Sequence, residues 1–222
     1  GILGVIIGGR LGYVLFYQFA RLVQEPLFFL RIWEGGMSFH GGLLGVLAAT
    51  WFFAYSQRIK LFAITDFLAP LTPIGLGMGR IGNFINGELW GVPTQWYWGM
   101  RIPCQHFPQQ CADTPWSEWS VPLHPSQLYE AALEGLGLFI LLWWFTSYSR
   151  PTMAASGLFL IAYAIARSII ELVRQPDVQL GYMAFGWMTM GHILSIPMLM
   201  GGLILLILAY WQHFTPTAHI TH

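Results

Sequence analysis

Charged side chains are scarce in this sequence. The 222 residues include 10 Lys and Arg and 10 Asp and Glu, so charge makes up 9% of the chain, against about 25% in a typical soluble domain. A water-soluble surface cannot be built from so few charges. The formal net charge is zero, and there is no cluster of Lys and Arg, which argues against a nucleic-acid partner.

Cysteine and the common catalytic motifs are also scarce. The two cysteines, Cys104 and Cys111, are too few for a disulfide scaffold. A loop can close the spacing between them, so the sequence alone allows either one disulfide or two free thiols. No His-Glu-x-x-His or Cys-x-x-Cys pattern predicts a metal site, and no Gly-x-Ser-x-Gly pattern predicts a serine nucleophile. If the protein is an enzyme, we expect its nucleophile to belong to a substrate.

Long hydrophobic runs are abundant instead. Hydrophobic residues make up 55% of the chain and aromatic residues 16%, with 11 Trp. A membrane-spanning segment needs about 20 mostly apolar residues and must be helical to satisfy its backbone in lipid. Six runs approach that length: 1–19, 41–55, 61–78, 128–148, 154–173 and 185–211. We therefore expect an all-α, polytopic membrane protein with six transmembrane helices, forming a single domain over residues 1–222.

The first run starts at the first residue of the chain. It is apolar from Ile2 onward, without a basic region before it or a small-residue cleavage site after it. We therefore expect a spanning helix rather than a signal peptide, in a chain that lacks its true N-terminus. Gly4, Gly8 and Gly12 recur at every fourth position, and such a stripe predicts the close approach of another helix.

Residues 80–127 form the longest polar connection, rich in Pro, Trp and Gln. We expect an extramembrane region here. Counting positive charges on alternating connections would place it in the cytoplasm. Arginines retained to bind an anion are not topology signals, however, so the count is weak support for that orientation.

The stretch 75–91, GLGMGRIGNFINGELWG, is the most informative. Gly77, Gly79 and Gly82 satisfy the dinucleotide-binding pattern G-x-G-x-x-G, but a strand must precede that pattern and none does. Arg80 and Asn83 are three residues apart and share a helical face. The planar guanidinium group of Arg suits phosphate, and the glycines would let an anionic ligand approach the backbone. The alternative is an interfacial Arg80 that extends to water.

A second group of polar residues lies in the fifth run. Tyr163, Arg167, Glu171 and Arg174 are spaced i, i+4, i+8 and i+11, which places them along one helical stripe. Because an ionisable residue at a helix centre costs about 2.5–3.5 kcal/mol on insertion scales, we expect the stripe to face the protein interior or a polar cavity. A simple Arg167–Glu171 ion pair explains part of the pattern but does not require the tyrosine.

Three histidines lie at or within the apolar runs. His40 is at the mouth of the second run, His124 precedes the fourth with Ser126 as a candidate N-cap, and His192 lies in the last run. Each has an ordinary structural explanation: a satisfied hydrogen bond, interfacial anchoring or a bond across helices. No pair of them has metal-ligand spacing.

These residues resemble a known family. GRIGNFINGELWG (79–91) is similar to the signature of the prolipoprotein diacylglyceryl transferases, and further blocks match in order along nearly the whole chain. They are GGRLGYVLFY, RIWEGGMSFHGGLLG, DFLAPLTPIGLGMGR, HPSQLYEAALEG and GLFLIAYAIARSIIELVRQPD. The family has seven spans, and its first, with a His-Trp-Tyr-Gly block, has no counterpart here.

The resemblance implies an activity. A diacylglyceryl group passes from phosphatidylglycerol to the lipobox cysteine thiol of a preprolipoprotein, forming a thioether and releasing glycerol phosphate, without a metal or diffusible cofactor. It also implies the bacterial inner membrane and a site facing the periplasm, which would place residues 80–127 in the periplasm. The rival hypotheses are a transporter for an anionic lipid or small anion, with Arg80 and Arg167 as its binding pair, and a structural or assembly subunit.

The resemblance also assigns roles. Arg80 and Arg167 would hold the phosphate and stabilise the charge that develops as glycerol phosphate leaves. A base must generate the thiolate, because a free Cys has a pKa of about 8.5; His40 is the candidate, with another group or the lipid phosphate as alternatives. Gly91 is expected to fix a turn. The predicted substrate-binding residues are Arg80, Asn83, Asn86, Glu88, Gly91, His124, Tyr163, Glu171 and Arg174.

Overall fold

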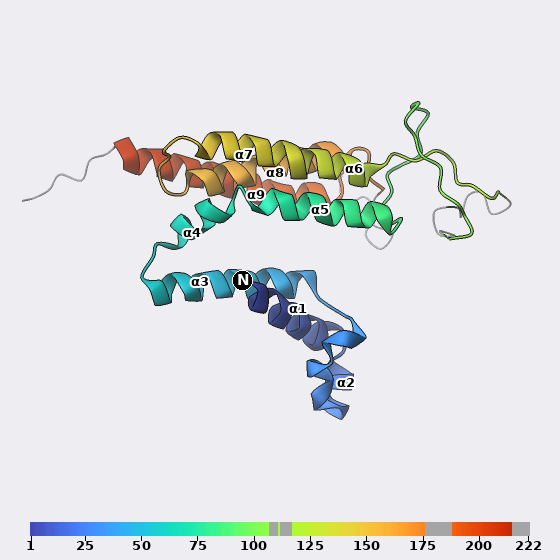
Figure 1. Cartoon of the computed structure of the whole chain (residues 1–222), viewed down its shortest axis with the longest axis horizontal. Helices are drawn as coiled ribbons and strands as arrows, with labels where there is room; N and C mark the ends of the chain where they lie inside the picture. Colours follow the sequence, from blue (N-terminus) through green and yellow to red (C-terminus); the bar gives the residue numbers. More distant parts are fainter. Residues whose placement is uncertain (107–110, 112–116, 176–187, 215–222) are drawn as a thin grey trace, which may run out of the picture. The chain divides into compact units, whose positions relative to one another are not determined.

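The computed structural model describes residues 1–106, 111, 117–175 and 188–214. The chain divides into two compact units, Gly1–Ile64 and Thr65–His222, and each is described by itself. Over the described residues the regular elements are helices (Figure 1), accompanied by isolated β-bridges. The expectation of an all-α protein is confirmed.

The first unit is built on two helices. α1 (Ile2–Tyr17) packs against α3 (Phe39–Gln57). Between them come α2 (Phe19–Gln24), η1 (Pro26–Leu30) and η2 (Ile32–Glu34).

The contact between α1 and α3 depends on glycine. A Cβ added at Gly4 would lie 2.7 Å from the Cβ of Ala49, and one added at Gly8 would lie 2.8 Å from the Cα of Gly45. Real Cβ atoms are never that close, so larger residues would push the helices apart. The close helix approach predicted from the glycine stripe is confirmed.

Arg10 of α1 is buried, with 1% of its surface exposed. Its Nε donates to the carbonyl of Phe29 at 3.0 Å, and its Nη2 donates to those of Phe28 at 2.7 Å and Arg31 at 2.8 Å. Its Nη1 donates to the carbonyl of Gly35. The residue therefore holds the connection between α1 and α3 in shape, a role that the sequence did not reveal.

The remaining helices lie in the second unit. Between α4 (Leu61–Leu68), which crosses the boundary between the units, and α5 (Thr72–Ile85) the chain bends by 47°. α6 (Ser126–Glu130), η4 (Ala131–Gly137, a π-helix) and α7 (Leu138–Thr146) follow one another without a break, and α8 (Ala154–Glu171) and α9 (Met190–Phe214) complete the unit.

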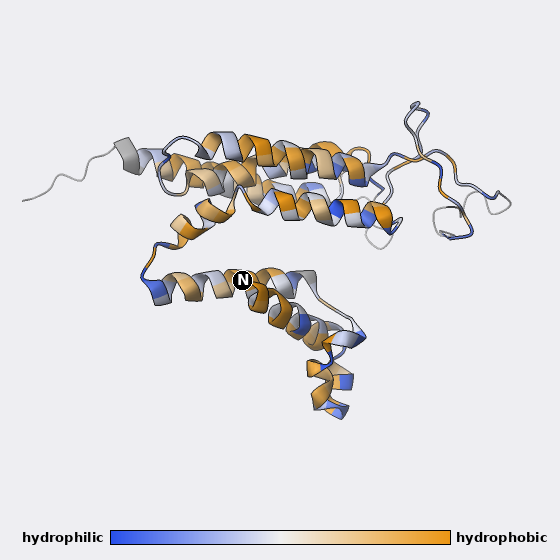
Figure 2. Cartoon of the chain, in the orientation of Figure 1, coloured by the Kyte–Doolittle hydropathy of each residue, from blue (hydrophilic) through white to orange (hydrophobic). Residues whose placement is uncertain are grey.

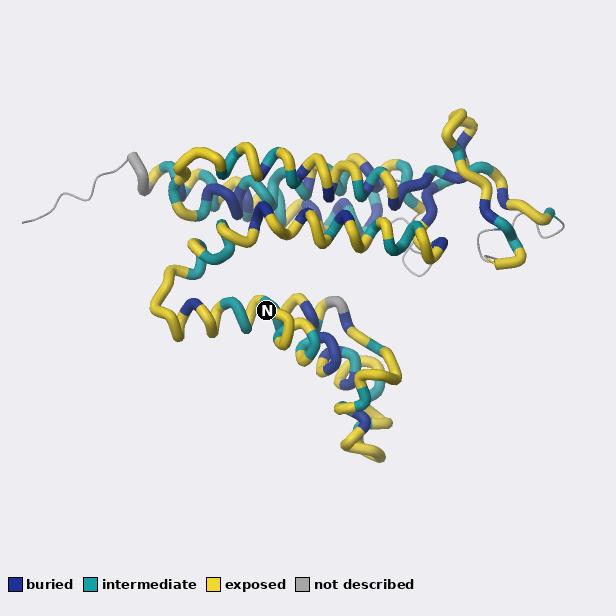
Figure 3. The backbone as a smooth tube through the Cα atoms, viewed as in Figure 1, coloured by how far each residue is buried: buried dark blue, intermediate teal, exposed yellow. Residues whose placement is uncertain are grey.

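Within the part of the chain that the structure describes, three helical segments are long and apolar enough to cross a membrane: Ser126–Thr146, Ala154–Glu171 and Met190–Trp211. The bent pair α4 and α5 makes a fourth if it counts as one span, and α1 is apolar but shorter. The helices are predominantly hydrophobic along their length (Figure 2), and many of their residues are exposed (Figure 3). These features are those of a membrane protein. The start of the predicted sixth run, residues 185–187, lies outside the described residues.

Asp66 explains how α8 begins. Its Oδ1 accepts from the backbone N–H of Ser156 at 2.8 Å and from its hydroxyl at 2.7 Å, and its Oδ2 accepts from the N–H of Met153 at 2.6 Å. The first N–H groups of a helix lack partners within the helix, so a carboxylate from another segment satisfies them. An acidic residue inside an apolar run is thus a helix cap.

The long connection between α5 and α6 begins at Asn86, not Arg80, because α5 continues to Ile85. It extends beyond the ends of both helices (Figure 1) and has a small core of Trp90, Ile102 and Leu123. Cys104 and Cys111 form a disulfide, with their Cα atoms 5.6 Å apart. Of the two alternatives that the sequence left open, the disulfide is the one in the structure.

Candidate functional site

Six charged side chains form one ion-pair cluster within the second unit. α5 contributes Arg80, the α6–η4 helix contributes Glu130 and Glu134, α8 contributes Arg167 and Glu171, and Arg174 follows α8. These are called the charge cluster below. It brings together four of the predicted site residues: Arg80, Arg167, Glu171 and Arg174.

Close helix packing makes the cluster possible. A Cβ added at Gly77 of α5 would lie 3.1 Å from the Cα of Gly135 in η4. Two facing glycines let the backbones of α5 and η4 approach. Arg80 and Glu134 lie next to this contact along their helices, so the approach brings their side chains within reach of each other.

Glu130 is shared by all three arginines. One carboxylate oxygen lies 2.5 Å from Nη1 of Arg167 and 3.1 Å from Nη1 of Arg174, and the other lies 3.4 Å from Nε of Arg80. Its side chain is fully buried. Removing it would leave three guanidinium groups close together without their common counter-ion.

Glu134 is equally buried but held less tightly. Its two oxygens lie 3.5 Å from Nη2 of Arg80 and 3.7 Å from Nη1 of Arg167. Among the residues that the structure describes, neither oxygen accepts a hydrogen bond.

Glu171 completes the cluster on the α8 side. Arg167 Nη2 lies 2.7 Å from it, so the ion pair between these two residues is confirmed. The hydroxyl of Thr189 donates to Glu171 at 2.7 Å and lies 3.1 Å from Nδ1 of His192. The Thr189 hydroxyl therefore links His192, near the start of α9, to Glu171 of the charge cluster.

The charges in this cluster balance. Three guanidinium groups face three carboxylates, and the side chains of Arg80, Arg167 and Arg174 are only 20%, 13% and 12% exposed. Charge buried in a membrane protein has to be paired. An entering phosphate could replace carboxylate oxygens on the same guanidinium donors, which is the chemistry that arginine suits best. Within the described residues, no group of acidic, His or Cys side chains could hold a metal ion.

The polar residues after Arg80 do not join the charge cluster. Asn83 is half-buried on the last turn of α5, while Asn86 and Glu88 are exposed just beyond it. Over the described residues, no hydrogen bond links their side chains to the cluster. A Cβ added at Gly79 or Gly82 would meet nothing within 4 Å, so this face of α5 is open beside Arg80.

The turn after α5 lies at Gly87 and Leu89, whose φ angles are 70° and 60°. The prediction that Gly91 fixes a turn is wrong. Gly91 bridges to Arg174, and a Cβ there would lie 2.8 Å from the Cβ of His124 and closer still to the carbonyl of Val173. It is glycine because three backbone segments meet at this point.

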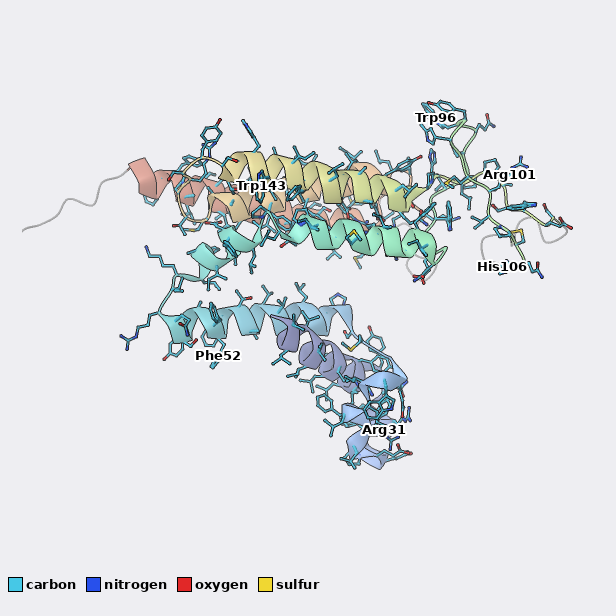
Figure 4. All side chains as sticks on the ribbon, viewed as in Figure 1. Arg31, Phe52, Trp96, Arg101, His106 and Trp143 are labelled. Atoms are coloured by element: carbon cyan, nitrogen blue, oxygen red, sulfur yellow. A yellow bond between two sulfur atoms is a disulfide. The ribbon has the colours of Figure 1, made fainter. Side chains whose placement is uncertain are left out.

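His124 lies in this same junction. Its Nδ1 is 3.1 Å from the hydroxyl of Tyr129, which also accepts from the indole Nε1 of Trp98 at 2.7 Å. Ser126 is not the N-cap of α6; Pro125 takes that position, and the Ser126 hydroxyl donates to the carbonyl of Leu89. These contacts attach the extended connection, which carries the labelled Trp96, Arg101 and His106 in Figure 4, to the N-terminal part of α6.

Two predicted residues remain, of which Tyr163 lies close enough to interact electrostatically with Glu134 and Arg167. Tyr163 is one turn before Arg167 on α8, with its ring stacked on that of Phe159 at 6.0 Å. His40 is exposed in the first turn of α3, whose N-cap is Ser38, and it belongs to the first unit, whereas the charge cluster belongs to the second.

Glu130 and Glu134 were not predicted as site residues. The signal was present, because two acids four residues apart in an apolar run share one helical face, as Arg167 and Glu171 do. Applying the cost of buried charge to every apolar run would have found both.

Comparisons with known proteins identify a family for this chain. The prolipoprotein diacylglyceryl transferase family matches residues 1–208. A phosphatidylglycerol–prolipoprotein diacylglyceryl transferase of Ectopseudomonas mendocina is 55% identical over 94% of this chain and 74% of its own length, and that of Methylococcus capsulatus matches equally. The transferase of Pseudomonas entomophila is 51% identical over 99% of this chain and 77% of its own length.

Proposed function

Because this chain belongs to the prolipoprotein diacylglyceryl transferase family, we propose that it transfers the diacylglyceryl group of phosphatidylglycerol to a prolipoprotein cysteine. The observation that carries the proposal is the meeting of Arg80 and Arg167 around shared carboxylates. Two guanidinium groups so placed can hold one phosphate between them. This is the first step in attaching lipid to a bacterial lipoprotein.

The transfer breaks one bond and forms another. The lipobox thiolate attacks the glyceryl carbon, the S–C bond forms, and the C–O bond breaks with its electron pair going to the phosphate oxygen. The thiol proton goes to a base, and glycerol phosphate leaves with its phosphorus intact. Arg80 and Arg167 stabilise the negative charge that builds up on the leaving phosphate. No cofactor or metal takes part.

The other predicted residues take the thiol proton, orient the arginines or contact the substrates. His40 is our candidate for the base that takes the thiol proton. Glu171 orients Arg167 through their ion pair, and Gly91 lets Arg174 and His124 come together. The remaining substrate-binding residues, Asn83, Asn86, Glu88 and Tyr163, contact the lipid or the peptide.

The protein acts in the bacterial inner membrane as one membrane domain. We propose that the four spans supported by length and composition are joined by α1 and α3, giving six. The connection from α5 to α6 lies in the periplasm, which agrees with its disulfide because disulfides persist in oxidising compartments. A probe attached near Gln95 should react with membrane-impermeant thiol reagents from outside; labelling only from inside would reverse this orientation.

The transporter hypothesis is not favoured. Relatives that share about half of the residues of this chain are named as transferases, and we found no internal duplication of the kind that marks inverted-repeat transporters.

The direct test is transfer by the full-length protein. We expect that protein in phosphatidylglycerol vesicles adds the mass of one diacylglyceryl group to the cysteine of a lipobox peptide. A peptide with Cys replaced by Ser is the matched control and should stay unmodified. An unmodified cysteine peptide, under conditions in which the Methylococcus capsulatus relative modifies it, would refute the proposal.

A further inference from the structure

Glu134 differs from the other two carboxylates of the charge cluster. Glu130 and Glu171 each have a guanidinium nitrogen at 2.5 or 2.7 Å. Glu134 has none closer than 3.5 Å and, over the described residues, accepts no hydrogen bond, although its side chain is fully buried. A carboxylate in this position gains the least from staying ionised.

The backbone holds Glu134 where it is. It lies within the π-helix η4, and π-helical turns inside α-helices are frequent at functional sites. The close contact of Gly77 with Gly135 brings α5 against this turn. Glu134 is therefore placed between Arg80 of α5 and Arg167 of α8, where the proposed phosphate binds.

The groups that face Glu134 set the charge balance. They are Arg80 on α5, Tyr163 and Arg167 on α8, Arg174 after it, and Glu130 on its own helix. The third carboxylate of the cluster, Glu171, pairs with Arg167. With all three carboxylates ionised, the cluster is neutral. A phosphodiester anion that enters would leave one uncompensated negative charge in a region of low dielectric constant, which is costly.

We propose that Glu134 takes up one proton when the phosphate of the lipid binds to Arg80 and Arg167. The inference rests on the proposed function, since the anion is the phosphate of that substrate. Proton uptake keeps the cluster neutral and frees guanidinium donors of both arginines for phosphate oxygens. The protonated carboxyl then has an O–H that donates to a phosphate oxygen.

Proton uptake has a defined effect on affinity. By linkage, binding that takes up one proton weakens about tenfold for each unit of rising pH over the range in which the empty site is ionised and the occupied site is protonated. A Glu134→Gln variant carries no charge at this position and already has the neutral form. It should bind the lipid with an affinity that does not depend on pH over the same range.

The measurement uses binding without chemistry. The full-length protein is titrated calorimetrically with short-chain phosphatidylglycerol, without peptide, in buffers of different ionisation enthalpy. We expect about one proton taken up per lipid bound in the natural protein and none in Glu134→Gln. Uncharged diacylglycerol, which lacks the phosphate, is the ligand control and should cause no uptake.

Infrared difference spectra assign the proton to a residue. Aspartate variants keep the number of charges, so Glu134→Asp should shift the carbonyl band of the protonated carboxyl, and the matched Glu130→Asp should leave it in place. Lipid binding without proton uptake, or a band that moves only in Glu130→Asp, would overturn this inference while the transferase proposal stands. Failure of the natural protein to bind the lipid would overturn both.

Discussion

Arg10 in the first unit and Arg167 in the second are both buried arginines, with opposite surroundings. The five N–H donors of Arg10 all go to backbone carbonyls, whereas Arg167 meets the carboxylates of Glu130 and Glu171. A guanidinium group has only five donors, so Arg10 has none left for a ligand. Carboxylates carry a charge that another anion can replace. The same side chain therefore shapes a loop in one unit and can bind an anion in the other.

The difference lies in what each partner can do. Backbone carbonyls are neutral and fixed by the chain, so removing Arg10 leaves several of them without a donor. Carboxylates on separate helices can change partners or take up a proton while the helices stay packed. Loss of Arg10 should thus appear as loss of structure, and loss of Arg167 as loss of activity.

The largest expected effect is on activity at Arg167. Replacing it with lysine keeps the charge but removes the planar pair of donors, and we expect transfer to fall about 10²- to 10³-fold, the cost of losing one donor that stabilises a transition state. Peptide modification measured by mass spectrometry provides the rate. The control is Arg101→Lys, on an exposed residue, which should retain activity. Near-normal transfer by Arg167→Lys would contradict the distinction between a structural Arg10 and an anion-binding Arg167.

Arg10→Leu should instead unfold the first unit. Each buried carbonyl left without a donor costs about 1–3 kcal/mol, so we expect a loss of about 3 kcal/mol or more and cleavage of the connection at 18–38 by protease. Thermal unfolding in detergent and limited proteolysis measure both. The control is Arg31→Leu, whose exposed ion pairs with Glu25 and Glu34 are worth less than about 1 kcal/mol. A stable but inactive Arg10→Leu protein would give Arg10 a direct role in the reaction.

A substitution at Gly91 tests whether the stability of the second unit also depends on close contacts between backbone segments. An added methyl group would force apart His124 and Val173, and overpacking of this kind costs about 1–3 kcal/mol. Gly91→Ala should therefore lower the unfolding temperature and, by moving Arg174, the activity. Gly201→Ala, where a Cβ meets nothing within 4 Å, is the control. Unchanged stability in Gly91→Ala would contradict the packing argument.

The helices could be predicted from the sequence because apolar runs of spanning length have few alternatives in lipid. The close approach of another helix to α1 could also be predicted, from the spacing of Gly4, Gly8 and Gly12, although the spacing does not identify α3 as the partner. Bonds between distant segments could not: nothing near Arg10 predicts its carbonyl partners, and nothing near Asp66 predicts that it caps α8.

The charge cluster was predicted in part for the same reason. Arg167 and Glu171 lie on one helix, so their pairing follows from helical spacing. Their meeting with Arg80 depends on the close packing of α5 against η4, which no local pattern predicts. Gly91 shows the reverse problem, because a glycine required by close backbone contact has the same sequence signal as a glycine in a turn.

The smallest expected effect distinguishes two glycines of α5, one required for helix packing and one beside space that a ligand could occupy. Gly77 touches Gly135, whereas a Cβ at Gly79 meets nothing within 4 Å. Gly79→Ala should therefore stabilise the helix by about 0.5–1 kcal/mol, the difference in helix propensity, and Gly77→Ala should destabilise it because η4 would have to move. If the lipid approaches the backbone beside Arg80, Gly79→Ala should raise the KM for phosphatidylglycerol while the protein becomes more stable. A stabilised variant with unchanged KM would show that the substrate does not bind against the open face of α5. Anion binding by the second unit would then rest on the charge cluster alone, and so would its contrast with Arg10.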